Sequence, residues 1–489
     1  MQLKFYNSLA RRVEPFEPLV PGKAGLYTCG PTVYNFAHIG NFRAYVFEDV
    51  LHRTLEYAGY ALTHVMNLTD VDDKTIRGSR AAGVPLRDYT QTYKDAFFED
   101  LRTLSVEPAT VYPAATDHIP EMIALISRLV EKGVAYRAAD GCVYFSVAKF
   151  PAYGRLAHLD FSGMRSGVRI SNDEYAKDAV GDFALWKAWD EADGPVKWDS
   201  PWGPGRPGWH IECSAMSMKY LGESFDLHTG GIDNLFPHHE NEIAQAEAAT
   251  GRPFVRCWMH CAHLRVDGEK MSKSLGNFYT LRDLLAKGWT GREIRYVLVA
   301  GHYRQPLNFA FDALAAARTA LSRIDEFTVR MEALAKGPAG KAPSAGSPEG
   351  QAPSPGSPEG QAPSWPNRHL EAFDAAISDD LNTPLALAAV FSLVNEGNRL
   401  AQDGRATPAD AAAALAALAR MDRVLAVLAR PAAEVPADVR ALAEERAAAR
   451  KAKDWAASDR LRDEIAARGW TVKDTKEGQR LAPAAAPRA

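Results

Sequence analysis

Five cysteines are few for a chain of 489 residues, and none of them stands in a Cys-x-x-Cys pair. Such sparse use of cysteine excludes a disulfide framework and indicates a reducing compartment. The sequence also lacks a run of about 20 apolar residues that could span a membrane. Its first residues, MQLKFYNSLARRVEPFEP, lack the apolar core of a secretion signal. We therefore expect a cytoplasmic protein without a membrane partner.

Neither sign of charge dominates the sequence. Lys and Arg number 57 against 61 Asp and Glu, which gives a formal net charge of −4. This balance excludes a generally polycationic nucleic-acid binder, although it allows a local basic strip. The length exceeds what a single hydrophobic core supports, so we expect about two to four domains.

A strand–loop–helix–strand unit opens the chain. Residues 25–29 (GLYTC) predict a short buried strand, and apolar residues at helical spacing over 46–58 predict a helix. Residues 60–68 (YALTHVMNL) predict a second strand. This order is typical of a doubly wound nucleotide-binding fold, in which ligands bind at the carboxyl ends of parallel strands. Residues that directly follow the two strands are therefore expected to face one crevice.

The loop after the first strand carries His38-Ile39-Gly40-Asn41 at the start of the predicted helix. A helix N-terminus offers unpaired N–H groups and a partial positive charge to a phosphate. His38 can donate a hydrogen bond to a phosphate oxygen, and Gly40 allows close approach of a nucleotide. A histidine beside a helix start is also a common local cap, so these four residues alone leave both roles open.

Near its middle the chain brings together residue types that bind metal. His238 and Glu242 are four apart and share one face of a helix, and Pro237 suits the first turn of that helix. With Cys213 they supply three ligands of a zinc site, and Cys29 is our candidate for the fourth. The same residues also fit a buried thiol beside a solvated helix face, because no Cys-x-x-Cys or His-Glu-x-x-His pattern is present.

A second basic motif follows in residues 267–278, DGEKMSKSLGNF. Its glycines and serines predict a mobile loop, in which Lys270 and Lys273 can neutralise charge that builds on a departing pyrophosphate. A solvated surface loop is the alternative for lysines in such a context.

Together these motifs resemble a known family. HIGN followed by KMSKS is similar to the signature pair of class I aminoacyl-tRNA synthetases. The longer stretches TCGPTVY, NLTDVDDK, GWHIECSAM, FPHHENEIAQ and KMSKSLGNF resemble the cysteinyl-tRNA synthetase family over most of residues 1–310 and more loosely beyond. Asn41 departs from the family pattern, in which the first signature commonly ends in a second histidine. Asparagine can still donate to phosphate, so we expect a changed contact rather than lost activity.

The resemblance implies an enzyme that joins cysteine to its tRNA. ATP and L-cysteine would give cysteinyl-adenylate, which would then esterify the 3′ end of cysteine tRNA. His38, Gly40 and Asn41 would hold phosphates, and Lys270 with Lys273 would stabilise the leaving pyrophosphate. We expect Mg²⁺ to accompany ATP and the chain to act as a monomer.

The resemblance also implies one zinc ion per chain. Its ligands would be Cys29, Cys213, His238 and Glu242. Zinc prefers a soft thiolate to a hydroxyl and lowers the pKa of a thiol, so it would distinguish cysteine from serine without an editing domain. Thr69 and Trp209 would line the amino-acid pocket. Cys257 and Cys261 match the family only partly, and we expect ordinary thiols there.

The fold class expected is α/β, with a doubly wound, parallel-sheet (Rossmann-like) catalytic domain that contains an inserted domain. An α-helical bundle and a small anticodon-binding domain would follow. The expected divisions are the first half of the catalytic domain (1–116), the inserted domain (117–207), the second half of the catalytic domain (208–250), the KMSKS-loop domain (251–312), the helical bundle (313–430, with a low-complexity insertion at 337–364) and the anticodon-binding domain (431–489).

Basic and aromatic residues recur in the last of these segments. Four basic residues could contact phosphates and two tryptophans could stack on the bases of single-stranded RNA: Arg446, Arg450, Lys451 and Lys453, with Trp455 and Trp470. A solvated helix face explains most charges of this segment equally well.

Two other functions compete with tRNA ligation. A related ligase joins cysteine to a glucosaminyl-inositol in mycothiol synthesis and shares the zinc site and both signatures. The terminal segment favours tRNA, because a ligase for a small sugar has no need of it. A non-catalytic RNA-binding relative is the second competitor. The intact His38, Lys270 and Lys273 argue against it, since a binder need not retain cations for a leaving group.

A low-complexity segment leads to a first prediction. Within 337–364 the unit APSAGSPEGQ is followed at once by APSPGSPEGQ, a composition that cannot build a core. We expect deletion of residues 340–362 to leave tRNA charging nearly intact. Charging rates of the deletion variant and the full chain test this, and a collapse of activity would show that the segment takes part in function.

Overall fold

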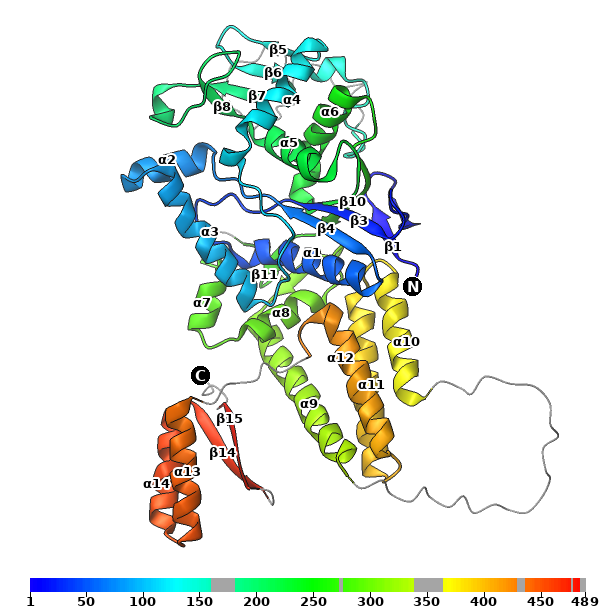
Figure 1. Cartoon of the computed structure of the whole chain (residues 1–489), viewed down its shortest axis with the longest axis vertical. Helices are drawn as coiled ribbons and strands as arrows, with labels where there is room; N and C mark the ends of the chain where they lie inside the picture. Colours follow the sequence, from blue (N-terminus) through cyan, green and yellow to red (C-terminus); the bar gives the residue numbers. More distant parts are fainter. Residues whose placement is uncertain (160–180, 272–275, 338–363, 429–435, 476–477, 484–489) are drawn as a thin grey trace, which may run out of the picture. The chain divides into compact units, whose positions relative to one another are not determined.

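Two units make up the chain, Met1–Leu428 and Ala429–Ala489. The computed structural model describes residues 1–159, 181–271, 276–337, 364–428, 436–475 and 478–483 (Figure 1). Lys273 and nearly all of the low-complexity insertion lie outside the described residues. None of the helices in the described residues has the length and apolarity that a membrane crossing demands.

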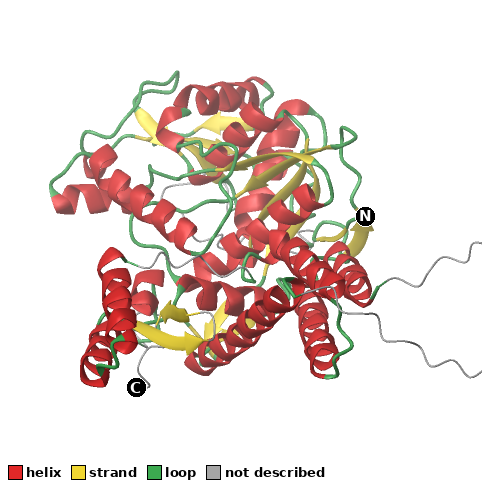
Figure 2. Cartoon of the chain, turned by 60° about the horizontal axis from the view of Figure 1, so that its bottom comes forward, coloured by secondary structure: helices red, strands yellow, loops and turns green. Residues whose placement is uncertain are grey.

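A four-stranded parallel sheet lies at the centre of the first unit, with helices on both faces (Figures 1 and 2). Its strands run in the order β10–β9–β3–β4. They are β10 (Val255–Cys261), β9 (Phe225–Gly231), β3 (Lys23–Thr28) and β4 (Ala61–Met66). All three neighbouring pairs are parallel. The doubly wound sheet predicted from the sequence is confirmed, and the strand order reverses between β3 and β9, where such folds bind ligands.

Helix α1 (Ile39–Tyr57) connects β3 to β4 as the strand–helix–strand pattern predicts. It is buried on nearly every side, and buried charged groups interrupt its apolar spacing. The Arg43 guanidinium donates to the carbonyls of Leu298, Gly301 and His302, and Asp49 pairs with Arg295. The Arg43 guanidinium thus bonds to backbone carbonyls, and Asp49 and Arg295 neutralise each other. Because these buried charged groups have partners, the helix can be buried within the unit.

A long excursion separates β4 from β9. It begins with α2 (Asp73–Ala82), α3 (Leu86–Thr103) and α4 (Ile119–Glu131). An antiparallel sheet follows, in the order β5 (Ala135–Arg137), β6 (Val143–Phe145), β7 (Phe183–Ala188) and β8 (Gly205–Pro207). Helix α5 (Trp209–Leu221) then returns the chain to β9, and α6 (Glu240–Thr250) links β9 to β10. The strand expected at 141–147 is β6.

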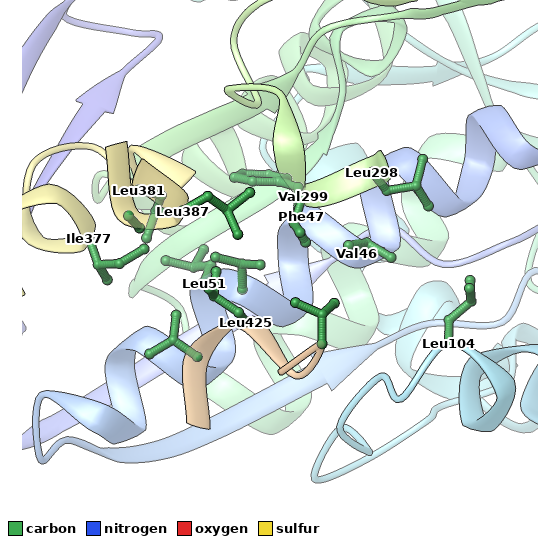
Figure 3. Close-up of a cluster of buried hydrophobic side chains, with 14 of the residues drawn as sticks. Val46, Phe47, Leu51, Leu104, Leu298, Val299, Ile377, Leu381, Leu387 and Leu425 are labelled. Carbon is green, nitrogen blue, oxygen red and sulfur yellow. The ribbon is translucent and has the colours of Figure 1, made fainter. Parts of the chain in front are cut away.

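The remaining elements of the first unit lie outside the central sheet and the long excursion. They are a hairpin of β1 (Lys4–Asn7) and β2 (Arg12–Pro15), a small sheet of β11 (Leu264–Val266), β12 (Glu269–Lys270) and β13 (Leu307–Phe309), and the helices α7 (Leu281–Ala286), α8 (Gly291–Ala300), α9 (Phe311–Ala335), α10 (Trp365–Ser378), α11 (Thr383–Gln402) and α12 (Pro408–Leu425). Val46 and Phe47 of α1 share one apolar core with residues of α8 and the bundle (Figure 3). The bundle of helices α9 to α12 therefore shares a hydrophobic core with the nucleotide-binding fold.

The second unit pairs α13 (Ala437–Lys451) and α14 (Trp455–Ala467) with a hairpin of β14 (Trp470–Thr475) and β15 (Gly478–Pro483). Arg446 is buried and donates to both carboxylate oxygens of Asp474, at 2.9 and 3.1 Å. Trp470 belongs to the small apolar core of the unit. The expectation that these two side chains could contact RNA is therefore wrong, whereas Trp455 is exposed and has the Arg450 guanidinium over its ring.

The Arg446–Asp474 pair leads to a stability prediction. We expect Asp474→Asn to destabilise this unit by about 1.5–3 kcal/mol, because a buried guanidinium then loses its charged acceptor. Hydrogen exchange of the α13 amides in the full chain measures the effect. The matched control is Asp459→Asn, which removes the exposed partner of Arg462 and should change little. Equal protection of α13 in both variants would contradict the prediction.

Candidate active site

Four predicted metal ligands meet at the carboxyl edge of the central sheet. Cys29 directly follows β3, and Cys213 lies in α5. His238 lies just before α6 and Glu242 in its first turn. One ligand atom from each of the four lies within 4.8 Å of all the others. The fold thus gathers residues that are more than 200 positions apart in the sequence, Cys29 and Glu242 among them.

The turn before α6 differs from the expected helix start. Residues Leu235–His239 form a wide turn in which Phe236 has an extended backbone (φ −141°, ψ 131°), and α6 proper begins at Glu240. Pro237 therefore lies in this turn and not in the first turn of α6, which corrects the sequence-based placement. The four-residue spacing still brings His238 Nε2 to 3.2 Å from Glu242 Oε1.

Burial decides the electrostatics of the four groups. A hydrogen bond with Cys213 and burial raise the pKa of the Cys29 thiol well above its usual value, and burial raises the pKa of Cys213. Burial also raises the pKa of Glu242 to about 8 and lowers that of His238 to about 3. Glu242 Oε1 is buried, and although His238 Nε2 lies 3.2 Å away, no residue that the structure describes makes a hydrogen bond to this oxygen. A cation would satisfy this oxygen and favour both thiolates, so the donor set fits a divalent, thiol-preferring metal.

Two further histidines that the sequence analysis missed contact these ligands. His228 of β9 places Nε2 2.9 Å from Glu242 Oε2, and His239 places Nε2 3.3 Å from Cys29 Sγ. With Cys29 and Glu242 they form a second, overlapping group of possible ligands. His239 was adjacent to a predicted ligand, and His228 lies on a strand that ends at the crevice. A prediction of strand β9 from the sequence would have placed His228 near the crevice.

The two predicted pocket residues lie beside this cluster. The Trp209 ring stacks on the His238 ring with centroids 4.2 Å apart, and 38% of Trp209 remains exposed. Thr69 donates through Oγ1 to Glu212 Oε2 at 2.8 Å, and Glu212 is the neighbour of Cys213 in the chain. Glu212 is fully buried and was not predicted. An exposed indole and a buried threonine thus border the metal-ligand cluster.

His38 caps α1, and its ring Nε2 has no hydrogen-bond partner among the residues that the structure describes. Its Nδ1 accepts from the Asn41 N–H at 3.1 Å, and Asn41 Oδ1 accepts from the His38 N–H at 3.1 Å. Burial lowers the pKa of His38, which favours the neutral ring. Because Nδ1 is the acceptor, the proton of the neutral ring is on Nε2. The two alternatives left open by the sequence are therefore compatible, since the cap orients a donor at the start of α1.

The lysine motif is anchored next to His38. The Ile39 N–H donates to the Tyr279 carbonyl at 2.9 Å, and the His38 ring lies edge-on to Phe278 at 5.1 Å. A Cβ added at Gly40 would lie 3.2 Å from Met271, so the two motifs approach closely there. Lys270 ends β12 and is exposed. Of the two predicted lysines, only Lys270 belongs to the part of the chain that the structure describes.

Cys257 and Cys261 lie on β10, apart from this cluster. Within the described residues, neither belongs to a group of side chains that could hold a metal ion. Burial raises the pKa of Cys261 to about 12 and also raises that of Cys257. A raised pKa disfavours the thiolate form of both side chains.

Comparison with known families assigns the chain. The family model described as "tRNA synthetases class I (C) catalytic domain" matches residues 15–319, which places the fold and its two signature motifs in a class I aminoacyl-tRNA synthetase. Models of a DALR domain and of a "Cysteinyl-tRNA ligase anticodon binding domain" match residues 372–429 and 432–481. The cysteine–tRNA ligase of Chlamydia pneumoniae is 50% identical over 484 residues, which cover 98% of each chain. That of Protochlamydia amoebophila is 47% identical over 484 residues, covering 98% of this chain and 97% of the relative. The chain belongs to the cysteine–tRNA ligase family.

Solved structures agree on the fold. Methionyl-tRNA synthetase of Mycobacterium tuberculosis in complex with methionyl-adenylate superimposes with a TM-score of 0.58 at 16% identity, covering 83% of this chain and 90% of that one. A LeuRS–tRNA–LeuAMS ternary complex from Agrobacterium radiobacter gives a TM-score of 0.57 at 13% identity, with coverages of 84% and 85%. The predicted family and fold class are thus confirmed.

Proposed function

We propose that this cysteine–tRNA ligase selects L-cysteine through one zinc ion per chain, held by Cys29, Cys213, His238 and Glu242. The convergence of these four donors within 4.8 Å carries the proposal. Enzymes of this class act on an amino acid, ATP and a tRNA. The finer assignments to L-cysteine, cysteine tRNA and Mg²⁺-bound ATP follow from the family and from the chemistry of the donor set.

The choice between the two overlapping ligand groups favours the one with two thiols. Zinc binds thiolate well, and a Cys₂HisGlu set supplies more of it than Cys29 with two histidines and Glu242. His239 contacts Cys29 Sγ through Nε2 at 3.3 Å and His260 through Nδ1 at 2.9 Å. His228 and His239 then support the ligands Glu242 and Cys29 by hydrogen bonding, as outer partners of metal sites commonly do.

The ion supplies one kind of chemistry when bound: it prefers the substrate thiolate to a hydroxyl and lowers the pKa of that thiol. Trp209 would cover the side chain of the substrate from its stacked position on His238. The Thr69 hydroxyl donates its one proton to Glu212, so toward the substrate its oxygen can only accept a hydrogen bond. The ammonium group of an amino acid is a suitable donor to such an oxygen.

Adenylate formation needs positioning rather than a protein nucleophile. A carboxylate oxygen of cysteine would bond to the α-phosphorus of ATP as the bond to the bridging oxygen breaks, and pyrophosphate leaves with the electron pair. His38 Nε2–H and the side-chain Nδ2 of Asn41 would hold the phosphates, and the positive end of the α1 dipole would favour their charge. Lys270 and Lys273 would neutralise the charge of the leaving group. Gly40 lets the His38 ring and Met271 lie close to the helix start, where a Cβ would be 3.0 Å from His38 Nδ1 and 3.2 Å from Met271.

We also propose the six domain divisions predicted from the sequence, a cytoplasmic location and a monomeric state. Gel filtration with light scattering tests the last of these. The last two divisions would bind the stem and the anticodon region of the tRNA, while the first four perform both chemical steps.

One experiment separates the candidate functions. The protein is incubated with ATP and cysteine, and with either cysteine tRNA or the glucosaminyl-inositol acceptor. Cysteine-dependent pyrophosphate exchange together with tRNA charging is expected. Exchange with transfer only to the sugar would replace the proposal by the sugar ligase, and absence of exchange would replace it by a non-catalytic binder. The match of an anticodon-binding domain over residues 432–481 favours tRNA.

A further inference from the structure

An exposed aromatic cluster lies two residues before the phosphate-binding motif. Tyr34 and Phe36, in the loop between β3 and α1, are 37% and 39% exposed. Single exposed apolar side chains are ordinary, but here two tyrosines of α3 contact the loop that carries both rings. Phe36 lies edge-on to Tyr93 at 5.5 Å, and Tyr93 contacts Tyr89 at 5.2 Å. We call Tyr34, Phe36, Tyr89 and Tyr93 the aromatic platform.

The platform is built to hold its shape. The Tyr89 hydroxyl donates to the Tyr34 carbonyl at 2.9 Å, which fixes the loop to α3. Tyr89 also packs tightly against α2, because a Cβ at Gly78 would lie only 2.3 Å from the Tyr89 hydroxyl oxygen. Substitution of this glycine would displace Tyr89. The exposed rings of Tyr34 and Phe36 are thus presented by a supported loop.

Cations accompany the rings. Lys74 Nζ lies 5.0 Å from the centre of the Tyr34 ring, and the Arg282 guanidinium lies 5.1 Å from that of Phe36. Arg282 is shared with Glu99 and Asp100. Lys74 makes no ion pair with any residue that the structure describes, and neither does Arg77, three positions on in the same helix. Aromatic rings with cations beside them are a usual means of binding single-stranded nucleic acid.

The position of the platform identifies which strand it would bind. The end of the tRNA must reach the adenylate, and the adenylate forms where His38 begins α1. Phe36 is two residues from His38, and Arg282 comes from α7, directly after the lysine motif. We propose that the aromatic platform stacks the unpaired 3′-terminal nucleotides of the tRNA acceptor arm, with Lys74 beside their phosphates. This inference rests on the proposed function, since it assigns a binding surface to the second step of that reaction.

Variants of exposed residues can test the platform without disturbing the core. In the full chain, Tyr34→Ala/Phe36→Ala is compared with the wild type for binding of cysteine tRNA and of the same tRNA lacking its unpaired 3′-terminal nucleotides. We expect the variant to bind intact tRNA about 5- to 150-fold more weakly, the range for loss of stacking on one base. Binding of the truncated tRNA should not change. Phe36→Tyr should retain most of the affinity, and Leu385→Ala, an exposed apolar residue of α11, serves as the control.

Two further measurements separate the outcomes. Cysteine-dependent pyrophosphate exchange without tRNA should be unchanged in the double variant, while charging falls. For Lys74→Ala, the slope of log affinity against log salt should be less steep by about 0.7, the value for one phosphate contact on a single strand. Equal loss of affinity for intact and truncated tRNA would overturn the inference. A raised KM for ATP in the exchange assay would also overturn it, because adenine of ATP would then occupy the platform. Absence of exchange in the wild type would instead refute the proposed function.

Discussion

Cys213→Ser is expected to abolish stoichiometric zinc binding and most cysteine-dependent pyrophosphate exchange. A serine hydroxyl does not ionise near neutral pH, so the site keeps one thiolate where it had two. Loss of an outer hydrogen-bond partner already weakens metal binding about 10–100-fold, and loss of a direct ligand should exceed this. The KM for cysteine should rise, because the substrate thiol loses the ion that prefers it to a hydroxyl. Elemental analysis of the purified variant and exchange kinetics measure both effects.

A second buried cysteine supplies the matched control. Cys142 of the inserted sheet is buried and accepts from the Ala188 N–H at 3.3 Å, yet it is not part of either possible ligand group. Cys142→Ser should retain zinc and a normal KM for cysteine. If Cys213→Ser keeps one zinc per chain, the ligand assignment is wrong. In that case Cys29, His228, His239 and Glu242, which also meet, become the alternative set.

The sequence predicted secondary structure best where a single local pattern indicates a single element. The strand–loop–helix–strand pattern predicted β3, α1 and β4, because period and turn residues agreed over that stretch. The partners of buried charged residues were less predictable. Helix α1 begins at Ile39, as the HIGN motif predicted, although the apolar spacing becomes clear only from Val46; the buried Arg43 and Asp49 are satisfied by partners from α8 and its following loop. Those partners lie about 250 residues away, so no local pattern could reveal them.

Contacts between residues far apart in the sequence were also unpredictable at the candidate site. Spacing predicted that His238 and Glu242 share a face, and the family resemblance added Cys29 and Cys213. Spacing did not predict that His228 would reach Glu242, because that contact depends on β9 pairing beside β3. The misassigned Arg446 is a further example. A basic residue on a helix of mixed charge predicts a solvated face, but Asp474 on the hairpin draws its guanidinium inside.

His38→Asn is expected to lower kcat for pyrophosphate exchange by about 10²- to 10³-fold, as for the loss of one preorganised donor to developing charge. Asparagine is a good N-cap, so its side chain can still accept from the Asn41 N–H and α1 should keep its start. It is too short, however, to reach where Nε2 donates. Steady-state exchange kinetics and urea unfolding, measured on the same preparation, separate the catalytic from the structural effect.

His38→Ala and His369→Asn complete the comparison. His38→Ala removes both the donor and the cap, so it should lose similar activity and, in addition, about 1 kcal/mol of stability. His369 pairs with Glu396 in the helical bundle, and His369→Asn tests whether any such substitution lowers activity. The dual role of His38 requires that His38→Asn be inactive but stable. If it instead unfolds as easily as His38→Ala while retaining exchange, His38 is only a cap, and the N–H groups of α1 with the lysine motif must hold the phosphates without it.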